Sequence, residues 1–176
     1  MQYNIQIIVL AIFIVRLAFL KLSKDNEKSI LANGGREYGA DNSKRLAILH
    51  VLFYFSCLAE SIFKKAAFDT QSLVGFALVV FALLMLYVVT RLLKGIWTVK
   101  LMIAKEHKFN DHWLFRVVKH PNYFLNIAPE LIGLALLCHA PYSAVVILPF
   151  YVFVLYKRIE EENRLIAEVI IPNGKI

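Results

Sequence analysis

Apolar residues along this chain are gathered into five long runs, which short polar connections separate. The five runs are residues 3–22, 46–63, 72–93, 124–140 and 142–156. A helix that crosses a bilayer needs about 20 largely apolar residues, and in lipid its backbone groups must be paired within the helix. The pattern therefore predicts an all-α integral membrane protein with about five transmembrane helices, the last two of which form a helical hairpin around Pro141.

Lysine and arginine are distributed unevenly over the connections between these runs. Six, two, seven, none and four of them fall in residues 21–45, 64–65, 91–119, 139–142 and 157–176. Cytoplasmic connections carry more lysine and arginine than those on the opposite side of the membrane. The alternation predicts an N-terminus outside and a cytoplasmic C-terminal tail. No internal repeat divides the chain, so we expect a single domain over residues 1–176.

The composition supports a membrane protein and excludes some partners. Hydrophobic residues make up 59% of the chain and charged residues 19%, whereas a soluble domain is about half apolar and about a quarter charged. The net charge of +7 does not indicate a nucleic-acid partner, because the cations lie between the apolar runs instead of forming one basic face. Membrane lipids are the expected surroundings. With no HExxH and no CxxC motif, we expect no metal site.

Two connections carry features of their own. Asn33-Gly34-Gly35 is typical of a turn in the first cytoplasmic connection. In the third connection the apolar residues predict a helix that continues from the third span or lies at the membrane surface. These residues are Trp97, Val99, Leu101, Met102 and Ile103.

Ionisable residues also occur inside the predicted spans. They are Arg16, His50, Glu60 and Glu130. Charged groups within a membrane span normally face a cavity or a charged partner. The sequence therefore predicts a bundle with a polar interior, although the individual roles of these residues stay open.

Two polar clusters, residues 119–123 and 158–164, lie at the start of the fourth run and the end of the fifth. Because a tight hairpin joins these runs, we expect the two clusters to be neighbours at the cytoplasmic surface. Ordinary structural roles are an alternative for both. Pro121 suits a helix start, Tyr123 suits the membrane interface, and Arg158 and Glu162 have the i, i+4 spacing of a helical ion pair.

Several stretches resemble one family of membrane enzymes. "KHPNYF" at residues 119–124, the hairpin, and "RIEEENRLI" at 158–166 resemble the isoprenylcysteine carboxyl methyltransferase family, as does "LLKGIWTVKLMIAKEHKF" before them. "RLAFLKLSKDNEKSILANGG" and "LAILHVLFYFS" are similar to short bacterial members, some of which O-methylate alkylpyrones. The resemblance implies an integral protein of the bacterial inner membrane that uses S-adenosylmethionine as methyl donor.

The resemblance also implies roles for individual residues. The residues that fall on the family's cofactor motif, or beside it, are His120, Asn122, Tyr123, Glu161 and Glu162. Those implied to be catalytic are Arg158, Glu162 and His120. An acidic oxygen is already ionised near neutral pH, so it needs an orienting cation more than a strong base, and arginine supplies one with fixed donor geometry.

The chain departs from the family at two places. Lys119 stands where the family usually has arginine, and the tail after Leu165 is short and lacks aromatic residues. The short tail argues against a prenylated protein as substrate and favours a lipophilic small molecule. Whether a carboxylate or an enolic or phenolic hydroxyl is methylated stays open, as does the oligomeric state.

Two other functions compete with this interpretation. A non-enzymatic small membrane protein, such as a transporter subunit or assembly factor, would leave the glutamates merely solvated. A membrane reductase with a similar helical core would bind NADPH, but no additional basic cluster is available for a 2′-phosphate. A dinucleotide-binding fold is excluded, because no GxGxxG follows a predicted strand.

Overall fold

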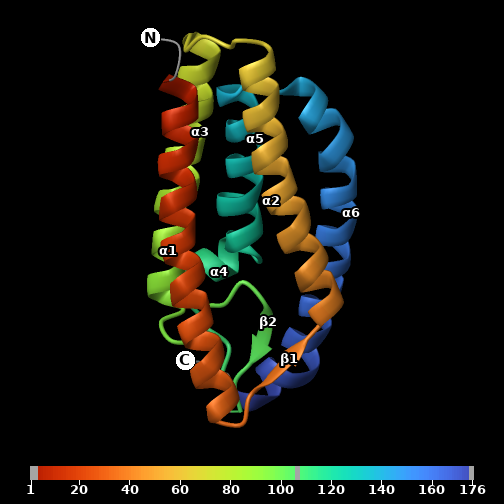
Figure 1. Ribbon diagram of the computed structural model, residues 1–176. Helices are drawn as coiled ribbons and strands as arrows, with labels where there is room; N and C mark the ends of the chain where they lie inside the picture. Colours follow the sequence, from red (N-terminus) through yellow and green to blue (C-terminus); the bar gives the residue numbers. More distant parts are fainter. Residues whose placement is uncertain (1–3, 106–107, 175–176) are drawn as a thin grey trace.

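The computed structural model describes residues 4–105 and 108–174, and long helices run between the two ends of the molecule (Figure 1). Four of them are long and apolar enough to cross a membrane by length and composition. They are α1 (Asn4–Ala32), α2 (Ala40–Phe63), α3 (Thr70–Leu92) and α6 (Pro141–Leu165), which continues as the π-helix η2 (Ile166–Ile170). A shorter apolar segment consists of the π-helix η1 (Asn122–Ile127) and α5 (Ala128–Leu137). The predicted helical architecture with membrane-spanning helices is confirmed, whereas the predicted number of about five spans stays a prediction, because the fifth apolar segment is shorter.

The helix boundaries refine the predicted spans. Helix α2 ends at Phe63 and α3 lies within two residues of its expected bounds, whereas α1 continues ten residues beyond Leu22 and α6 nine beyond Tyr156. These extensions are polar, so they carry charged side chains out of the apolar layer. The expected start at Tyr3 lies outside the described residues. The sidedness of the membrane stays a prediction.

A small sheet replaces the helix predicted in the third connection. The strands β1 (Arg36–Tyr38) and β2 (Leu101–Ile103) pair antiparallel, with Glu37 opposite Met102. The helix prediction for residues 97–103 is therefore wrong. All three side chains of β2 are buried, since the strand packs under the end of α6. The turn at Asn33-Gly34-Gly35 is confirmed and leads into β1.

Helix α5 lies in the middle of the bundle and packs most closely against α3 (Figure 1). Gly75 and Gly133 meet at this crossing. A Cβ on Gly75 would lie 2.5 Å from the carbonyl oxygen of Gly133 and 2.3 Å from the backbone nitrogen of Leu137. The two glycines therefore let the backbones approach closely, as small residues do between membrane helices.

The turn between α5 and α6 is held by Glu60 of α2. Its Oε2 accepts hydrogen bonds from the backbone nitrogen of Ser143 at 2.8 Å and from the Ser143 hydroxyl at 2.7 Å. Lys64 donates to its Oε1 at 2.6 Å. Because the first backbone N–H groups of a helix lack intrahelical partners, this carboxylate stabilises the start of α6. Glu60 thus has a structural role far from the polar clusters.

Candidate active site

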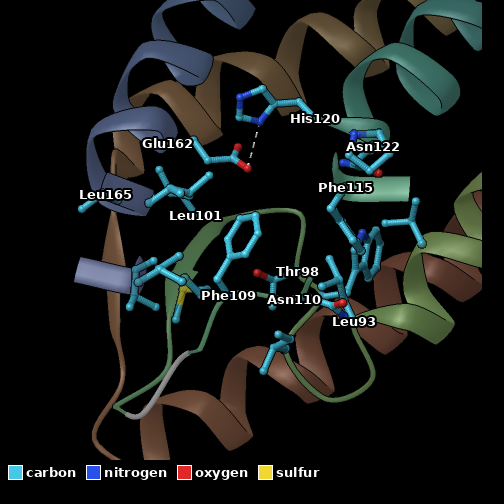
Figure 2. Close-up of a pocket in the computed structure, with 18 of the residues that line it drawn as sticks. Leu93, Thr98, Leu101, Phe109, Asn110, Phe115, His120, Asn122, Glu162 and Leu165 are labelled. Atoms are coloured by element: carbon cyan, nitrogen blue, oxygen red, sulfur yellow. Dashed lines mark hydrogen bonds and ion pairs between the residues drawn. The ribbon is translucent and has the colours of Figure 1, made fainter. Parts of the chain in front are cut away.

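A cavity of about 160 Å³ opens at the end of the bundle that carries the β1–β2 sheet (Figure 2). Three stretches of chain line it. They are the end of α3 through β2, the connection up to Tyr123, and the segment from Arg158 to Ile170. One water molecule needs roughly 10–15 Å³ of such space, so the cavity has room for about ten waters and is far larger than a packing defect.

The His-Pro stretch turns the chain into the cavity wall. Pro121 has φ −62°, the value that a helix start requires, and the carbonyl of His120 accepts from the backbone nitrogens of Tyr123 and Phe124. The following turns form the π-helix η1 instead of an α-helix. Single π-turns of this kind are frequent at functional sites. The turn places His120, Asn122 and Tyr123 at the cavity.

Glu162 joins α6 to this turn (Figure 2). Its Oε1 lies 3.3 Å from Nδ1 of His120, and its Oε2 accepts the hydroxyl hydrogen of Tyr123. The other ring nitrogen of His120 lies 3.0 Å from Oδ1 of Asn163. Burial opposes the charged form of His120, but the hydrogen bond and the negative charge of Glu162 outweigh it, so the pKa of His120 is raised above its usual value.

Arg158 is a buried cation that neutral groups hold in place. Only 4% of the residue is exposed, and its guanidinium donates to the Tyr123 hydroxyl at 3.2 Å, the Val99 carbonyl at 3.2 Å and the Ser43 hydroxyl. Within residues 4–105 and 108–174 it forms no ion pair with a carboxylate. Three of its five N–H donors are used, and two remain. Its charge interacts with that of Glu162 across the Tyr123 hydroxyl, and the cavity leaves room for an anion to contact the guanidinium directly.

The sequence-predicted residues are brought together with one exception. Residues that line the cavity are His120, Asn122, Tyr123, Arg158 and Glu162. Glu161 is not among the cavity-lining residues, and its carboxylate lies against Gly39, before α2. The helical ion pair between Arg158 and Glu162 is not found, because the Tyr123 hydroxyl lies between them and bonds to both.

The short tail takes part in the cavity wall. Leu165, Ile166 and Ile170 line it, and the backbone nitrogen of Phe109 donates to the carbonyl of Gly174 at 2.9 Å. Aliphatic side chains of the tail therefore form one side of the cavity. Residues of this kind give an apolar wall against which a lipid or a ring can pack.

The residues that hold Arg158 in place could not be identified from the sequence. Ser43 belongs to no motif, and Val99 contributes only its carbonyl. The backbone nitrogen of Val99 in turn donates to the hydroxyl of Ser23 in α1 at 2.8 Å. Serine hydroxyls at charged helix ends are common, so only the folded chain reveals these contacts.

A second cluster of similar residues lies deeper in the bundle. Arg16 pairs with Glu130 at 2.8 Å, and Tyr54 donates its hydroxyl hydrogen to the other oxygen of this carboxylate. Nε2 of His50 lies 3.3 Å from Nη2 of Arg16. Glu130 is fully buried. The predicted polar interior is thus an intramembrane cluster of Arg16, His50, Tyr54 and Glu130, distinct from the pocket cluster of His120, Tyr123, Arg158 and Glu162.

Comparisons with known proteins give a family and two relatives. The model of the isoprenylcysteine carboxyl methyltransferase family matches residues 73–168, more than half of the chain. An uncharacterized protein of Haemophilus influenzae is 46% identical over 152 residues, covering 86% of this chain and 88% of the relative. The uncharacterized protein YpbQ of Bacillus subtilis is 24% identical over 162 residues, covering 92% and 96%. No solved structure matches.

Proposed function

The chain belongs to the isoprenylcysteine carboxyl methyltransferase family, and on that premise we propose that it methylates an acidic oxygen of a lipophilic small molecule. Family membership supports a membrane methyltransferase, and members of the family use S-adenosylmethionine as methyl donor. The acceptor that we propose carries a carboxylate or an enolic or phenolic hydroxyl, as an alkylpyrone does. The proposed location is the bacterial inner membrane, with the site on the cytoplasmic side.

The observation that carries the proposal is that Arg158 contacts no carboxylate directly within residues 4–105 and 108–174. Its guanidinium is buried at the cavity, and the nearest carboxylate, that of Glu162, is already bonded to His120 and Tyr123. An anionic oxygen of the acceptor would supply the missing counter-ion. The two remaining N–H donors of the Arg158 guanidinium can orient such an oxygen, because the planar group holds them in a fixed geometry.

The residues that line the cavity offer charges and surfaces that suit the methyl donor. S-adenosylmethionine combines a cationic sulfonium and ammonium group with a carboxylate and a flat adenine ring. Glu162 offers a negative charge for the cationic side, and the amide of Asn122 lies at the wall. Phe109 and Phe115 add flat apolar surface for a ring.

When bound, the donor supplies a methyl group whose S–CH₃ bond breaks as the O–CH₃ bond forms, with the electron pair remaining on sulfur. Arg158 holds the acceptor oxygen for in-line attack, and correct placement alone lowers such a barrier substantially. Tyr123 keeps Glu162 and Arg158 apart, so that each charge stays available to its own ligand. The aliphatic tail excludes water from a reaction in which opposite charges cancel.

Transfer of a labelled methyl group tests this function. Purified protein in lipid nanodiscs is incubated with methyl-labelled S-adenosylmethionine and a lipid extract, and label is counted in the organic phase. Label that is lost on mild base treatment indicates a methyl ester, and label that persists indicates an enol or phenol ether. We expect Arg158→Leu to transfer almost none. Equal transfer by this variant would contradict the role of Arg158.

A further inference from the structure

Helix α1 lies outside the stretch that the family model matches, yet its Arg16 is connected to the cavity. Nη1 of Arg16 donates to Oδ1 of Asn126 in η1 at 3.5 Å, and Nδ2 of Asn126 donates to Oδ1 of Asn122 at 3.1 Å. Asn122 lies at the cavity wall (Figure 2). Hydrogen-bonded side chains thus connect the intramembrane cluster to the proposed methyl-donor site.

Arg16 decides the direction of both hydrogen bonds, the one that it forms with Asn126 and the one between Asn126 and Asn122. Arginine has only donors, so the Asn126 atom that faces Arg16 must be the carbonyl oxygen. The amide nitrogen of Asn126 therefore faces Asn122 and must find an acceptor there. Asn122 accordingly offers its oxygen to Asn126, which leaves its own N–H groups free. No acceptor for them occurs in the described parts of the chain.

Burial makes this order difficult to reverse. Asn126 is 1% exposed, and Arg16 is fixed by its ion pair with the fully buried Glu130. Turning the Asn126 amide over would set its N–H groups against the guanidinium and leave a buried oxygen unpaired. In the membrane interior no water compensates for such a loss.

We propose that Arg16 and Asn126 are positioning residues, which fix the Asn122 amide as a hydrogen-bond donor to an acceptor atom of the bound methyl donor. This inference rests on the proposed function, because it takes the cavity to be the methyl-donor site. It gives α1 a part in ligand recognition that neither the family match nor the motif at residues 119–124 contains. The ligand atom that meets Asn122 must be an acceptor, such as a carboxylate oxygen or a ring nitrogen.

A double-mutant cycle tests the connection. Binding of S-adenosylhomocysteine, which lacks the sulfonium charge, is measured by calorimetry on the full chain in detergent. Because Asn126 and Asn122 belong to one hydrogen-bond network, we expect Asn126→Leu to weaken binding about tenfold. In an Asn122→Ala background the same change should weaken it less than about twofold. Equal losses in both backgrounds would show that Asn126 acts on overall structure, and would overturn the inference.

A second pair of variants tests the direction of the two hydrogen bonds. Each replaces an asparagine by aspartate, whose nearly equal size limits the risk of misfolding. Asn126→Asp still accepts from Arg16 but cannot donate when ionised, so it should lose affinity as Asn126→Leu does. Asn122→Asp accepts from Asn126 but has no donor, so it should bind as weakly as Asn122→Ala. Wild-type affinity in either Asp variant would overturn the proposed direction.

Matched controls separate this inference from the proposed function. Glu60→Gln, at the opposite end of the bundle, should lower the melting temperature and leave affinity unchanged. Wild-type protein that binds neither S-adenosylhomocysteine nor S-adenosylmethionine would refute the methyltransferase function itself. Normal wild-type binding with unaffected Asn126 variants would refute only the positioning role.

Discussion

The intramembrane cluster and the pocket cluster contain the same four residue types but connect them differently. In each, a glutamate accepts a tyrosine hydroxyl, through Tyr54 to Glu130 in one and Tyr123 to Glu162 in the other. A histidine stands beside each carboxylate. The difference lies in the arginine. Arg16 contacts its glutamate directly at 2.8 Å, whereas the tyrosine hydroxyl separates Arg158 from its glutamate.

This difference separates a closed ion cluster from an open one. In the intramembrane cluster the charges neutralise each other, and Glu130 is fully enclosed. In the pocket cluster Arg158 is held by neutral groups, the Ser43 hydroxyl and the Val99 carbonyl, and faces a cavity. Closed clusters hold helices together, whereas an unpaired buried cation is stabilised when an anionic ligand arrives. The same residue types thus stabilise the fold in the intramembrane cluster and, as we propose, take part in methyl transfer in the pocket cluster.

A substitution that breaks the intramembrane cluster should have the largest effect on the stability of the protein. Glu130→Ala leaves the half-buried Arg16 without its carboxylate partner, and removing one member of a buried ion pair costs about 3–5 kcal/mol. We expect a loss of this size in the free energy of unfolding, measured by reversible denaturation in mixed micelles. The double variant Arg16→Met/Glu130→Met should recover most of it. A Glu130→Ala variant as stable as wild type would mean that the pair does not hold the bundle.

The corresponding change in the open cluster should affect activity more than stability. Arg158→Leu removes a cation that forms no ion pair within residues 4–105 and 108–174, but it also leaves three acceptors, at Tyr123, Ser43 and Val99, without their donor. The free energy of unfolding should therefore fall by less than in Glu130→Ala. Loss of one oriented donor to a reacting oxygen typically costs about 10²–10³-fold in rate. We expect kcat/KM for methyl transfer to fall by this amount. A variant that loses stability as Glu130→Ala does would erase the distinction between the clusters.

Substitution of Tyr123 or Tyr54 should show the same difference between the two clusters with smaller effects. Tyr123→Phe removes the hydroxyl between Arg158 and Glu162 and lets the two charges approach each other. A hydrogen bond to a charged group contributes about 1.5–3 kcal/mol, so methyl-donor affinity should fall roughly ten- to a hundredfold. Tyr54→Phe is the matched control, and should lower stability while leaving affinity unchanged. Equal effects of both substitutions on affinity would contradict the account.

The smallest expected effect is a pH dependence of stability from His120. Its pKa is raised in the folded protein, because the hydrogen bond and charge of Glu162 outweigh the opposing effect of burial. A raised pKa means that the stabilisation is fully present below the unfolded value of about 6.5 and is lost as pH rises through the folded value. The melting temperature should therefore decrease above pH 6.5, and His120→Gln should flatten that decrease. An unchanged slope in the variant would exclude His120 as its source.

Much of the fold and part of the site could be predicted from the sequence. Apolar run length indicates membrane helices because the bilayer core sets the length they need. The hairpin indicates that His120 and Glu162 are neighbours, although 42 residues separate them. The β1–β2 sheet was missed because two three-residue strands have too few positions to show an alternating pattern.

The partner of each arginine could not be predicted. Spacing suggested that Arg158 pairs with Glu162, but it bonds to Ser43, which is 115 residues away. Asn126 looked like an ordinary residue within an apolar run, and only the helix packing brings it to Arg16. Such contacts depend on the rotation of each helix about its axis, which side-chain packing decides.

Equilibrium binding of S-adenosylmethionine to the purified protein tests the central claim most directly. Calorimetry on the wild type should give saturable one-site binding, weakened at least tenfold by Glu162→Gln and unchanged by Glu60→Gln, whose carboxylate only caps α6. A wild-type protein that remains folded by thermal denaturation and binds no S-adenosylmethionine would contradict the account.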